Sequence, residues 1–171
     1  MIDDVDAFER ELIDALPIAL EHVPDADAEH YDAVLEGALV SSTHARLFGW
    51  LHIPRETVVE LKTCQRWIND RGSGLDRRRG RWKIDRDAHR ELVARDGVYL
   101  LAVLEGGVDD VRAWVMLPAE ELDPHLPSWT SNGESETREA SKQVRWADVI
   151  RPADLAETTP TVEADGGYGG W

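Results

Sequence analysis

The chain of 171 residues is long enough for one globular domain, and its 34 acidic against 19 basic residues give a net charge of −15 at pH 7. Its longest apolar stretches fall short of the roughly 20 residues that cross a bilayer, and its N-terminus is acidic. We therefore expect a soluble, cytoplasmic protein without a membrane partner. The single cysteine, Cys64, excludes an internal disulfide and a cysteine-based zinc site.

The acidic excess and the preference for arginine over lysine indicate a protein of a salt-rich cytoplasm, where dense carboxylates keep the surface hydrated. This is a hypothesis. Measured stability that rises as salt is removed would contradict it.

The first half of the chain predicts one helix followed by three strands. Apolar residues at spacings of three and four predict a helix that begins at Asp3 or Asp4 and continues to Leu20, kinked or divided by Pro17. The three predicted strands cover residues 33–40, 45–53 and 57–63.

The second half predicts a helix between strands. Asp85 is expected to cap a helix that ends near Arg95, and the almost continuously apolar run that follows predicts a strand buried on both faces. The remaining predictions are a Gly- and Arg-rich loop over 69–80, strands over 81–84, 98–104 and 111–117, a short helix over 119–122, a polar loop over 128–142, and a strand or short helix over 143–150.

Together these elements predict an α/β fold, in which a central mixed β-sheet is flanked by helices. The single domain is expected to cover residues 1–157. Residues 158–171, with four glycines, are expected to form a disordered tail.

Two charged residues share one face of the predicted strand 57–63. Side chains alternate along a strand, so Glu60 and Lys62 project together from an otherwise apolar run. The chain has sixteen arginines and only three lysines, which makes a lysine here informative. Phosphodiester hydrolysis needs a metal ion and a group that positions water. Glu60 offers a carboxylate of the kind that Mg²⁺ prefers, Lys62 can hold the attacking water, and one more acid is needed.

Residues 66–95 form a basic island, with ten basic and five acidic residues, while the rest of the chain carries a net charge of −20. The run from Arg77 to Arg81 packs like charges together, which favours a polyanion site over pairing with surface carboxylates. At about 1 M salt the Debye length is about 3 Å, so only close arginine–phosphate contacts remain effective. Trp67 and Trp82 flank the arginines, where they either stack on unpaired bases or pack in the core.

The Glu60-Leu61-Lys62 motif in a strand, an upstream acid, Gln65, and the helix and buried strand over 89–104 resemble the PD-(D/E)XK nuclease superfamily, which has the restriction-endonuclease-like fold. The resemblance covers about residues 5–117 and implies an α-β-β-β-α-β core. It implies that an aspartate, Glu60 and the Leu61 carbonyl bind Mg²⁺ or Mn²⁺ and that Lys62 is the water-positioning base. Gln65 would contact phosphate or order Lys62.

The acid that partners Glu60 is left open by the sequence. Asp32 is the first candidate, 28 positions upstream, and it requires residues 41–56 to form an inserted hairpin. Glu36 is the second candidate. The third is His52 in place of the aspartate, which would weaken binding of Mg²⁺. Glu9 and Glu11 on the first helix loosely match a glutamate that some members carry there, and a solvated role is their simpler explanation.

The leading hypothesis is a metal-dependent nuclease acting on DNA, with Asp32, Glu60, Lys62 and Gln65 as the catalytic residues. The residues expected to grip the phosphate backbone are Arg66, Arg77, Arg78, Arg79, Arg81, Lys83 and Arg86. One alternative is a nucleic-acid-binding protein on the same fold whose metal site has decayed. Another is an interaction protein whose arginines dock an acidic partner. The sequence leaves open DNA against RNA, and whether the chain forms a homodimer.

Overall fold

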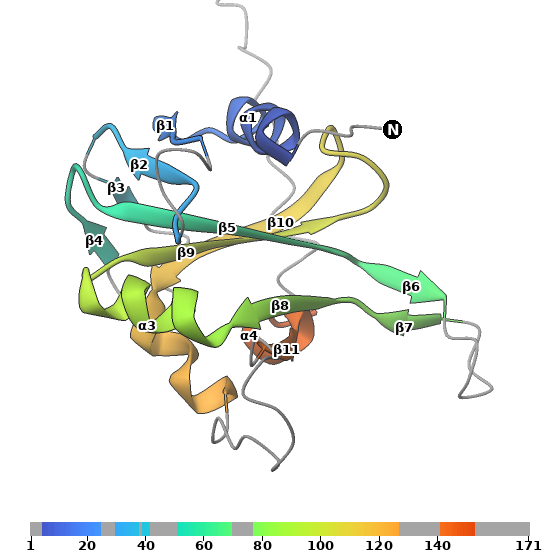
Figure 1. Cartoon of the computed structure of the whole chain (residues 1–171). Coiled ribbons are helices and arrows are strands. Elements are labelled where there is room, and N and C mark those ends of the chain that lie inside the picture. Colours follow the sequence, from blue (N-terminus) through green and yellow to red (C-terminus); the bar gives the residue numbers. More distant parts are fainter. Residues whose placement is uncertain are drawn as a thin grey trace, which may run out of the picture.

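A five-stranded mixed sheet forms the centre of the computed structural model, in which residues 5–24, 30–37, 39–41, 51–69, 77–126 and 141–152 are described. The strand order is β1-β2-β5-β9-β10, and only β5 and β9 run parallel (Figure 1). The five strands are β1 (Leu20–His22), β2 (Ala33–Leu35), β5 (Val58–Gln65), β9 (Val98–Leu104) and β10 (Val111–Pro118). The predicted α/β fold with a central mixed sheet is confirmed.

Three two-stranded antiparallel ribbons and several helices surround this sheet. The ribbons are β3 (Leu39–Ser41) with β4 (Leu51–Ile53), β6 (Trp67–Asn69) with β7 (Arg77–Arg79), and β8 (Arg81–Asp85) with β11 (Ser141–Arg145). The helices are α1 (Val5–Ala15), α3 (Arg86–Ala94), the 3₁₀ helix η1 (Ala119–His125) and α4 (Trp146–Val149). In the part of the chain that the structure describes, no helix is long and apolar enough to cross a membrane.

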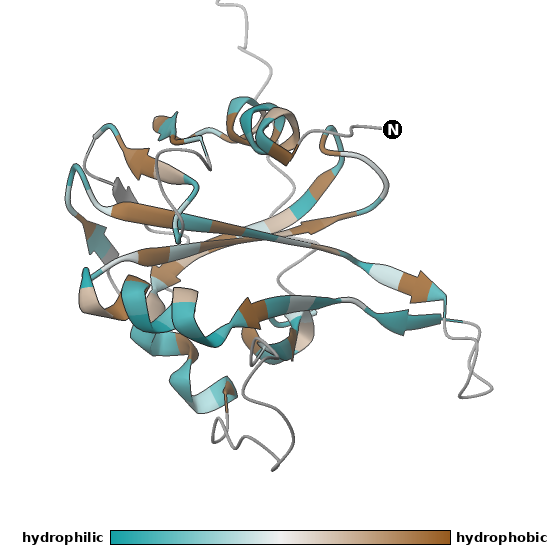
Figure 2. Ribbon diagram, in the orientation of Figure 1, coloured by the Kyte–Doolittle hydropathy of each residue, from teal (hydrophilic) through white to brown (hydrophobic). Residues whose placement is uncertain are grey.

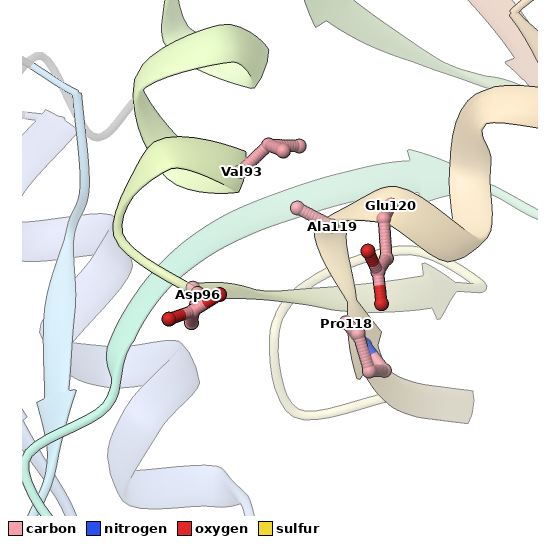
Figure 3. Close-up of a pocket in the computed structure, with 6 residues that line it drawn as sticks. Val93, Asp96, Pro118, Ala119 and Glu120 are labelled. Atoms are coloured by element: carbon pink, nitrogen blue, oxygen red, sulfur yellow. The ribbon is translucent and has the colours of Figure 1, made fainter.

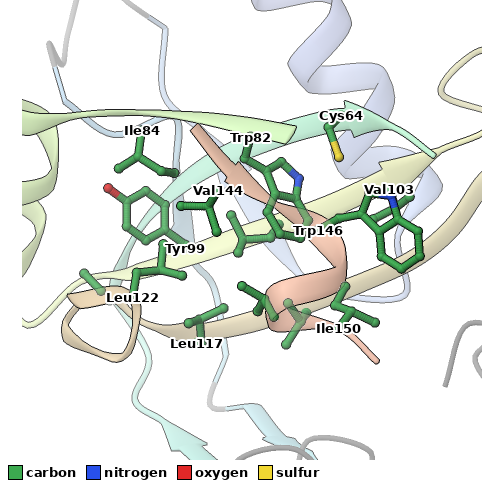
Figure 4. Packing of buried hydrophobic residues seen from close by; sticks show 14 of the residues in the cluster. Cys64, Trp82, Ile84, Tyr99, Val103, Leu117, Leu122, Val144, Trp146 and Ile150 are labelled. Carbon is green, nitrogen blue, oxygen red and sulfur yellow. The ribbon is translucent and has the colours of Figure 1, made fainter. Parts of the chain in front are cut away.

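Both faces of the sheet are covered, so β9 is buried along its whole length. Figure 1 shows α1 on one side and α3, β8 and α4 on the other. On the first side Leu100 belongs to a core with Leu12 of α1. On the second side Leu101 belongs to a core with Trp82 and Trp146 (Figure 4). Hydrophobic residues accordingly fill β9 (Figure 2). The predicted buried strand is confirmed, as are the strand over 111–117 and the helix capped by Asp85.

The first helix is shorter than the sequence predicted. It ends at Ala15, and Leu20, which continues the helical spacing, belongs to β1 instead. Pro17 explains the difference, because a proline ring clashes with the preceding helical turn and so ends the helix before it. The predicted strand over 33–40 is likewise divided into β2 and β3.

Strand β7 was predicted as part of a loop. Arg77–Arg79 pair in register with Trp67–Asn69, although three consecutive arginines carry no alternating apolar pattern. Several predicted segments lie outside the described residues. They are residues 45–50 of the predicted strand 45–53, residues 70–76 of the predicted loop, most of the polar segment 128–142, and the predicted tail.

Gly80 fixes the point where β7 passes into β8. A Cβ atom at this position would lie 1.8 Å from the carbonyl oxygen of Gln65. The backbone N–H of Gly80 donates to the carbonyl of Arg66 at 3.3 Å. The β6–β7 ribbon is therefore joined to the end of β5 through a contact that only glycine permits.

We expect Gly80→Ala to destabilise the protein by about 1–3 kcal/mol, because the backbone of Gln65 must move away from the new methyl group. Gly107→Ala is the matched control, since a Cβ there meets no atom within 4 Å. Urea denaturation measures both free energies of unfolding. Equal values for the two variants would contradict this account of Gly80.

Candidate active site

Strand β5 carries Glu60 and Lys62 on the sheet face opposite α1. Leu61, which lies between them, belongs to the core under α1, as the alternation of a strand requires. The Glu60 carboxylate forms an ion pair with the Lys62 ammonium. Glu60 is 5 % exposed, whereas the Lys62 side chain is 28 % exposed. The pair therefore runs from a buried carboxylate to an ammonium that reaches solvent.

Asp32 lies beside this pair. Strand β2 pairs with β5 only through Ala33–Val59 and Val34–Val58, so Asp32 stands at the end of the pairing, next to Glu60. Its Oδ2 accepts the backbone N–H of Leu61 at 2.6 Å, and its own N–H donates to Val59 at 2.9 Å. In the intervening segment β3 pairs with β4, as the long separation in sequence requires. The structure thus brings Asp32, Glu60 and Lys62 together.

The Leu61 carbonyl points to the same edge of β5. A residue in a strand directs its N–H and its C=O to the same side. Because the Leu61 N–H points to Asp32, its carbonyl also points away from β9 and toward the acidic residues. This is the orientation that a backbone ligand in the site would need.

The site is crowded with carboxylates. Burial, together with the charges of Asp32 and Glu9, raises the pKa of Glu60 to about 7, although Lys62 lowers it. Burial acts to lower the pKa of Lys62, but Glu60, Asp32 and Glu9 outweigh it and raise this pKa above its ordinary value. With Asp32, Glu60 and Lys62 all ionised, the two carboxylates and one ammonium leave a formal charge of −1. Oxygen donors with this charge fit a hard divalent cation.

A second acidic group lies at α1, where Asp6 and Glu9 lie beside His22, and the charge of Glu9 acts weakly on Glu60 and Lys62. The Nε2 atom of His22 on β1 lies 3.2 Å from Oε2 of Glu9 and 3.8 Å from Oδ1 of Asp6. One ligand atom from each residue lies within 4.8 Å of the others, which makes this a second possible metal group. The spacing of Asp6 and Glu9 predicts a shared helix face. His22 could not be placed from the sequence, because its strand follows a run with helical spacing.

Three predicted candidates lie elsewhere in the described structure. Gln65 lies on the opposite face of β5, where its Nε2 donates to the carbonyl of Gly106 at 2.9 Å and its Oε1 accepts the Gly106 N–H at 3.1 Å. The amide ties the end of β5 to the turn after β9. Glu36 is exposed after β2, and His52 is exposed on β4 in a separate ribbon. The structure brings none of these three together with Glu60.

A buried polar chain lies behind the site. Tyr99, the register partner of Glu60, is 1 % exposed, and burial followed by the charge of Glu60 raises its pKa above the ordinary value. Nδ1 of His89 lies 3.3 Å from the Tyr99 hydroxyl, and Nε2 lies 2.9 Å from Oδ1 of Asp123. This chain connects η1 to the strand that supports Glu60.

The basic island divides into paired and unpaired cations. Its paired members include Arg66, which lies 3.0 Å from Glu105, and Arg86, which lies 3.4 Å from Asp87. A second set forms no ion pair with any carboxylate in the described ranges: Arg77, Arg78, Arg79, Arg81 and Lys83. Pairing with surface carboxylates therefore accounts for part of the island and leaves its centre available to an anion.

An α/β sheet whose neighbouring strands bring an aspartate against a Glu-x-Lys motif defines a restriction-endonuclease-like core. The family model described as PD-(D/E)XK nuclease superfamily domain matches residues 4–151, and the chain belongs to this superfamily. No curated protein and no solved structure matches the chain. Membership implies a nuclease-like function and a nucleic-acid substrate, and the superfamily is typically metal-dependent.

The raised pKa of Glu60 predicts a pH dependence of stability. A carboxyl group whose pKa is higher in the folded state opposes folding when ionised. The free energy of unfolding therefore increases as pH falls from about 7 toward 4.5, the ordinary pKa of a glutamate. Between pH 8 and pH 5, the metal-free wild type should therefore gain about 2 kcal/mol relative to Glu60→Gln, which lacks this titration.

Urea denaturation in EDTA at both pH values measures this difference. Glu120→Gln, at an exposed position on η1, is the control and should follow the wild type. A constant difference between wild type and Glu60→Gln across this pH range would contradict the raised pKa.

Proposed function

We propose that the protein is a Mg²⁺-dependent nuclease that hydrolyses phosphodiester bonds of DNA. The contact between Asp32 and the Leu61 N–H supports this proposal most directly, because it holds a second carboxylate next to Glu60. Together with Lys62, these residues supply the two acids and the ammonium that the superfamily uses.

Asp32, Glu60 and the Leu61 carbonyl would hold the ion. They offer only oxygen donors, which Mg²⁺ and Mn²⁺ prefer. The bound ion supplies charge neutralisation at the phosphate and a more acidic water. Burial, and after it the charge of Asp32, raises the pKa of Glu60, so a cation there would stabilise the ionised carboxylate.

Lys62 would position the attacking water and stabilise charge that develops on the phosphate. Its raised pKa keeps the amine protonated at neutral pH, so it acts first as a hydrogen-bond donor. The ion pair with Glu60 fixes the ammonium, and the partial exposure of the side chain lets it reach a substrate. Gln65 is not included in the proposed catalytic set, since its amide is engaged by Gly106.

We expect Glu60→Gln, Asp32→Asn and Lys62→Ala each to lower cleavage of labelled DNA with Mg²⁺ by at least about 100-fold, since each removes a group that acts at the phosphate. Glu120→Gln is the matched control and should cleave like the wild type. Gel analysis in high salt measures the rates. Activity unchanged in Glu60→Gln or Lys62→Ala would refute the proposed mechanism.

Metal binding separates this proposal from a relative whose metal site has decayed. Isothermal titration with Mn²⁺ should show binding at pH 8 that weakens at pH 6, because Glu60, with a pKa of about 7, becomes protonated. Glu60→Gln should bind more weakly at pH 8 and should lose most of this pH dependence. Nucleic-acid binding without a metal signal would favour the decayed site.

A further inference from the structure

A groove between the β6–β7 ribbon and α4 gathers cations in this acidic protein. Its volume is about 480 Å³, and its lining includes Trp67, Arg77, Arg78, Arg79, Arg81 and Arg145. Among the lining residues that the structure describes, the one acid is Asp148, which lies 2.9 Å from Arg145 and is thus already paired. The other four arginines form no ion pair with a carboxylate among the residues described. The groove therefore has a net positive charge that an anion can balance.

Trp67 presents an aromatic ring at this groove. It is 39 % exposed, and within the described ranges Val5 is the only other large hydrophobic residue that is exposed. Trp82 and Trp146 are buried at 0 % and 2 %, so they are packing residues. The guanidinium of Arg66 lies 5.9 Å from the Trp67 ring centroid. An exposed ring between cations is the arrangement on which unpaired bases stack.

The β6–β7 ribbon projects beyond the central sheet (Figure 1). Each of its strands has three residues, and every side chain of β7 is exposed and hydrophilic (Figure 2). A ribbon this short gains little stability from burying its own surface. Its composition is better explained by a ligand than by the core.

Strand β8 leads from the groove back toward the active site. Arg81 and Lys83 are exposed along β8, which ends at Asp85. Ile84, which precedes Asp85, belongs to the same core cluster as Tyr99, the register partner of Glu60, so this end of β8 lies near the site (Figure 4). At about 3.3 Å per residue, the path from Arg81 to Asp85 is roughly 13 Å.

A second depression has lining residues of the opposite charge. It has a volume of about 220 Å³, and its charged lining residues are Asp96 and Glu120 (Figure 3). Two carboxylates would repel a phosphate.

We propose that the groove binds single-stranded nucleic acid, with phosphates on the arginines of β7 and β8 and one unpaired base stacked on Trp67. The bases of a duplex are stacked on one another, so only an unpaired base can offer its face to the ring. Arginine matches phosphate with paired N–H donors at short range, and these contacts are effective where salt screens longer interactions. The inference rests on the proposed function in taking the bound strand as the substrate.

The test measures fluorescence anisotropy of a labelled 20-nucleotide DNA strand and of the blunt duplex of the same sequence. The full chain is used in EDTA, at the lowest salt at which circular dichroism shows it folded. The wild type should bind the single strand at least 10-fold more tightly than the duplex. Trp67→Ala should weaken single-strand binding roughly five-fold to 100-fold, as expected for one stacked base, and leave duplex binding unchanged.

Trp67→Phe is the matched variant and should retain most of the single-strand affinity, because phenylalanine also stacks. Arg78→Ala should weaken binding and reduce its salt dependence, whereas Arg95→Ala, at an arginine paired with Glu91 on α3, should not. Equal affinity for both probes, or no effect of Trp67→Ala, would overturn the inference. Binding of neither probe would overturn it in favour of an acidic protein partner.

Cleavage with Mg²⁺ is assayed separately, so that the two proposals fail independently. If the single strand binds in a Trp67-dependent way but is never cleaved, the proposed nuclease activity is refuted and the single-strand site is retained. Cleavage of the single strand at the same rate in Trp67→Ala as in the wild type would leave the nuclease and refute the single-strand site.

Discussion

The burial of Glu60 beside Asp32 is the constraint on which the candidate site depends. Taking an ionised carboxylate out of water costs several kcal/mol unless charges and hydrogen bonds compensate it. Lys62 compensates Glu60, and the Leu61 N–H compensates Asp32. The compensation is incomplete, because two carboxylates share one ammonium and the charge of Glu9 also acts on Glu60. The fold therefore maintains an excess of negative charge at one edge of β5, and a divalent cation is the simplest group that would balance it.

Strand β5 can carry these charges because β9 supplies the apolar contacts that β5 gives up. All seven residues of β9 are buried, and its parallel register places Tyr99 beside Glu60. The Tyr99 side chain has an apolar ring and a polar hydroxyl, and both are used at this position. Its ring packs with Trp82 and Leu101, while its hydroxyl meets His89. The support of the site thus extends through His89 to η1, and the geometry of Glu60 depends on packing well outside the acidic cluster.

Local patterns predicted those parts of the molecule that local physics determines. The period of a strand placed Glu60 and Lys62 on one face, and a capping aspartate marked the start of α3. The contact between Asp32 and Leu61 was beyond such patterns, because it depends on pairing across an inserted ribbon. Gln65 shows the opposite failure. Its proximity to Glu60 in the sequence suggested a role at the site. However, Gln65 is an odd number of residues from Glu60 along the same strand, so the two side chains lie on opposite faces of the sheet.

The acidic composition and the cationic groove are two parts of one electrostatic arrangement. A surface dominated by carboxylates repels nucleic acid from most directions, so productive approach is limited to the region where positive charge is unpaired. Ion pairs with carboxylates balance the charges of Arg66, Arg86 and Arg95, so these arginines attract a polyanion less strongly. What remains is β7 and the start of β8, joined to β5 through Gly80. Under the proposed function, the same repulsion would direct a phosphate chain toward the edge where Glu60 and Lys62 lie.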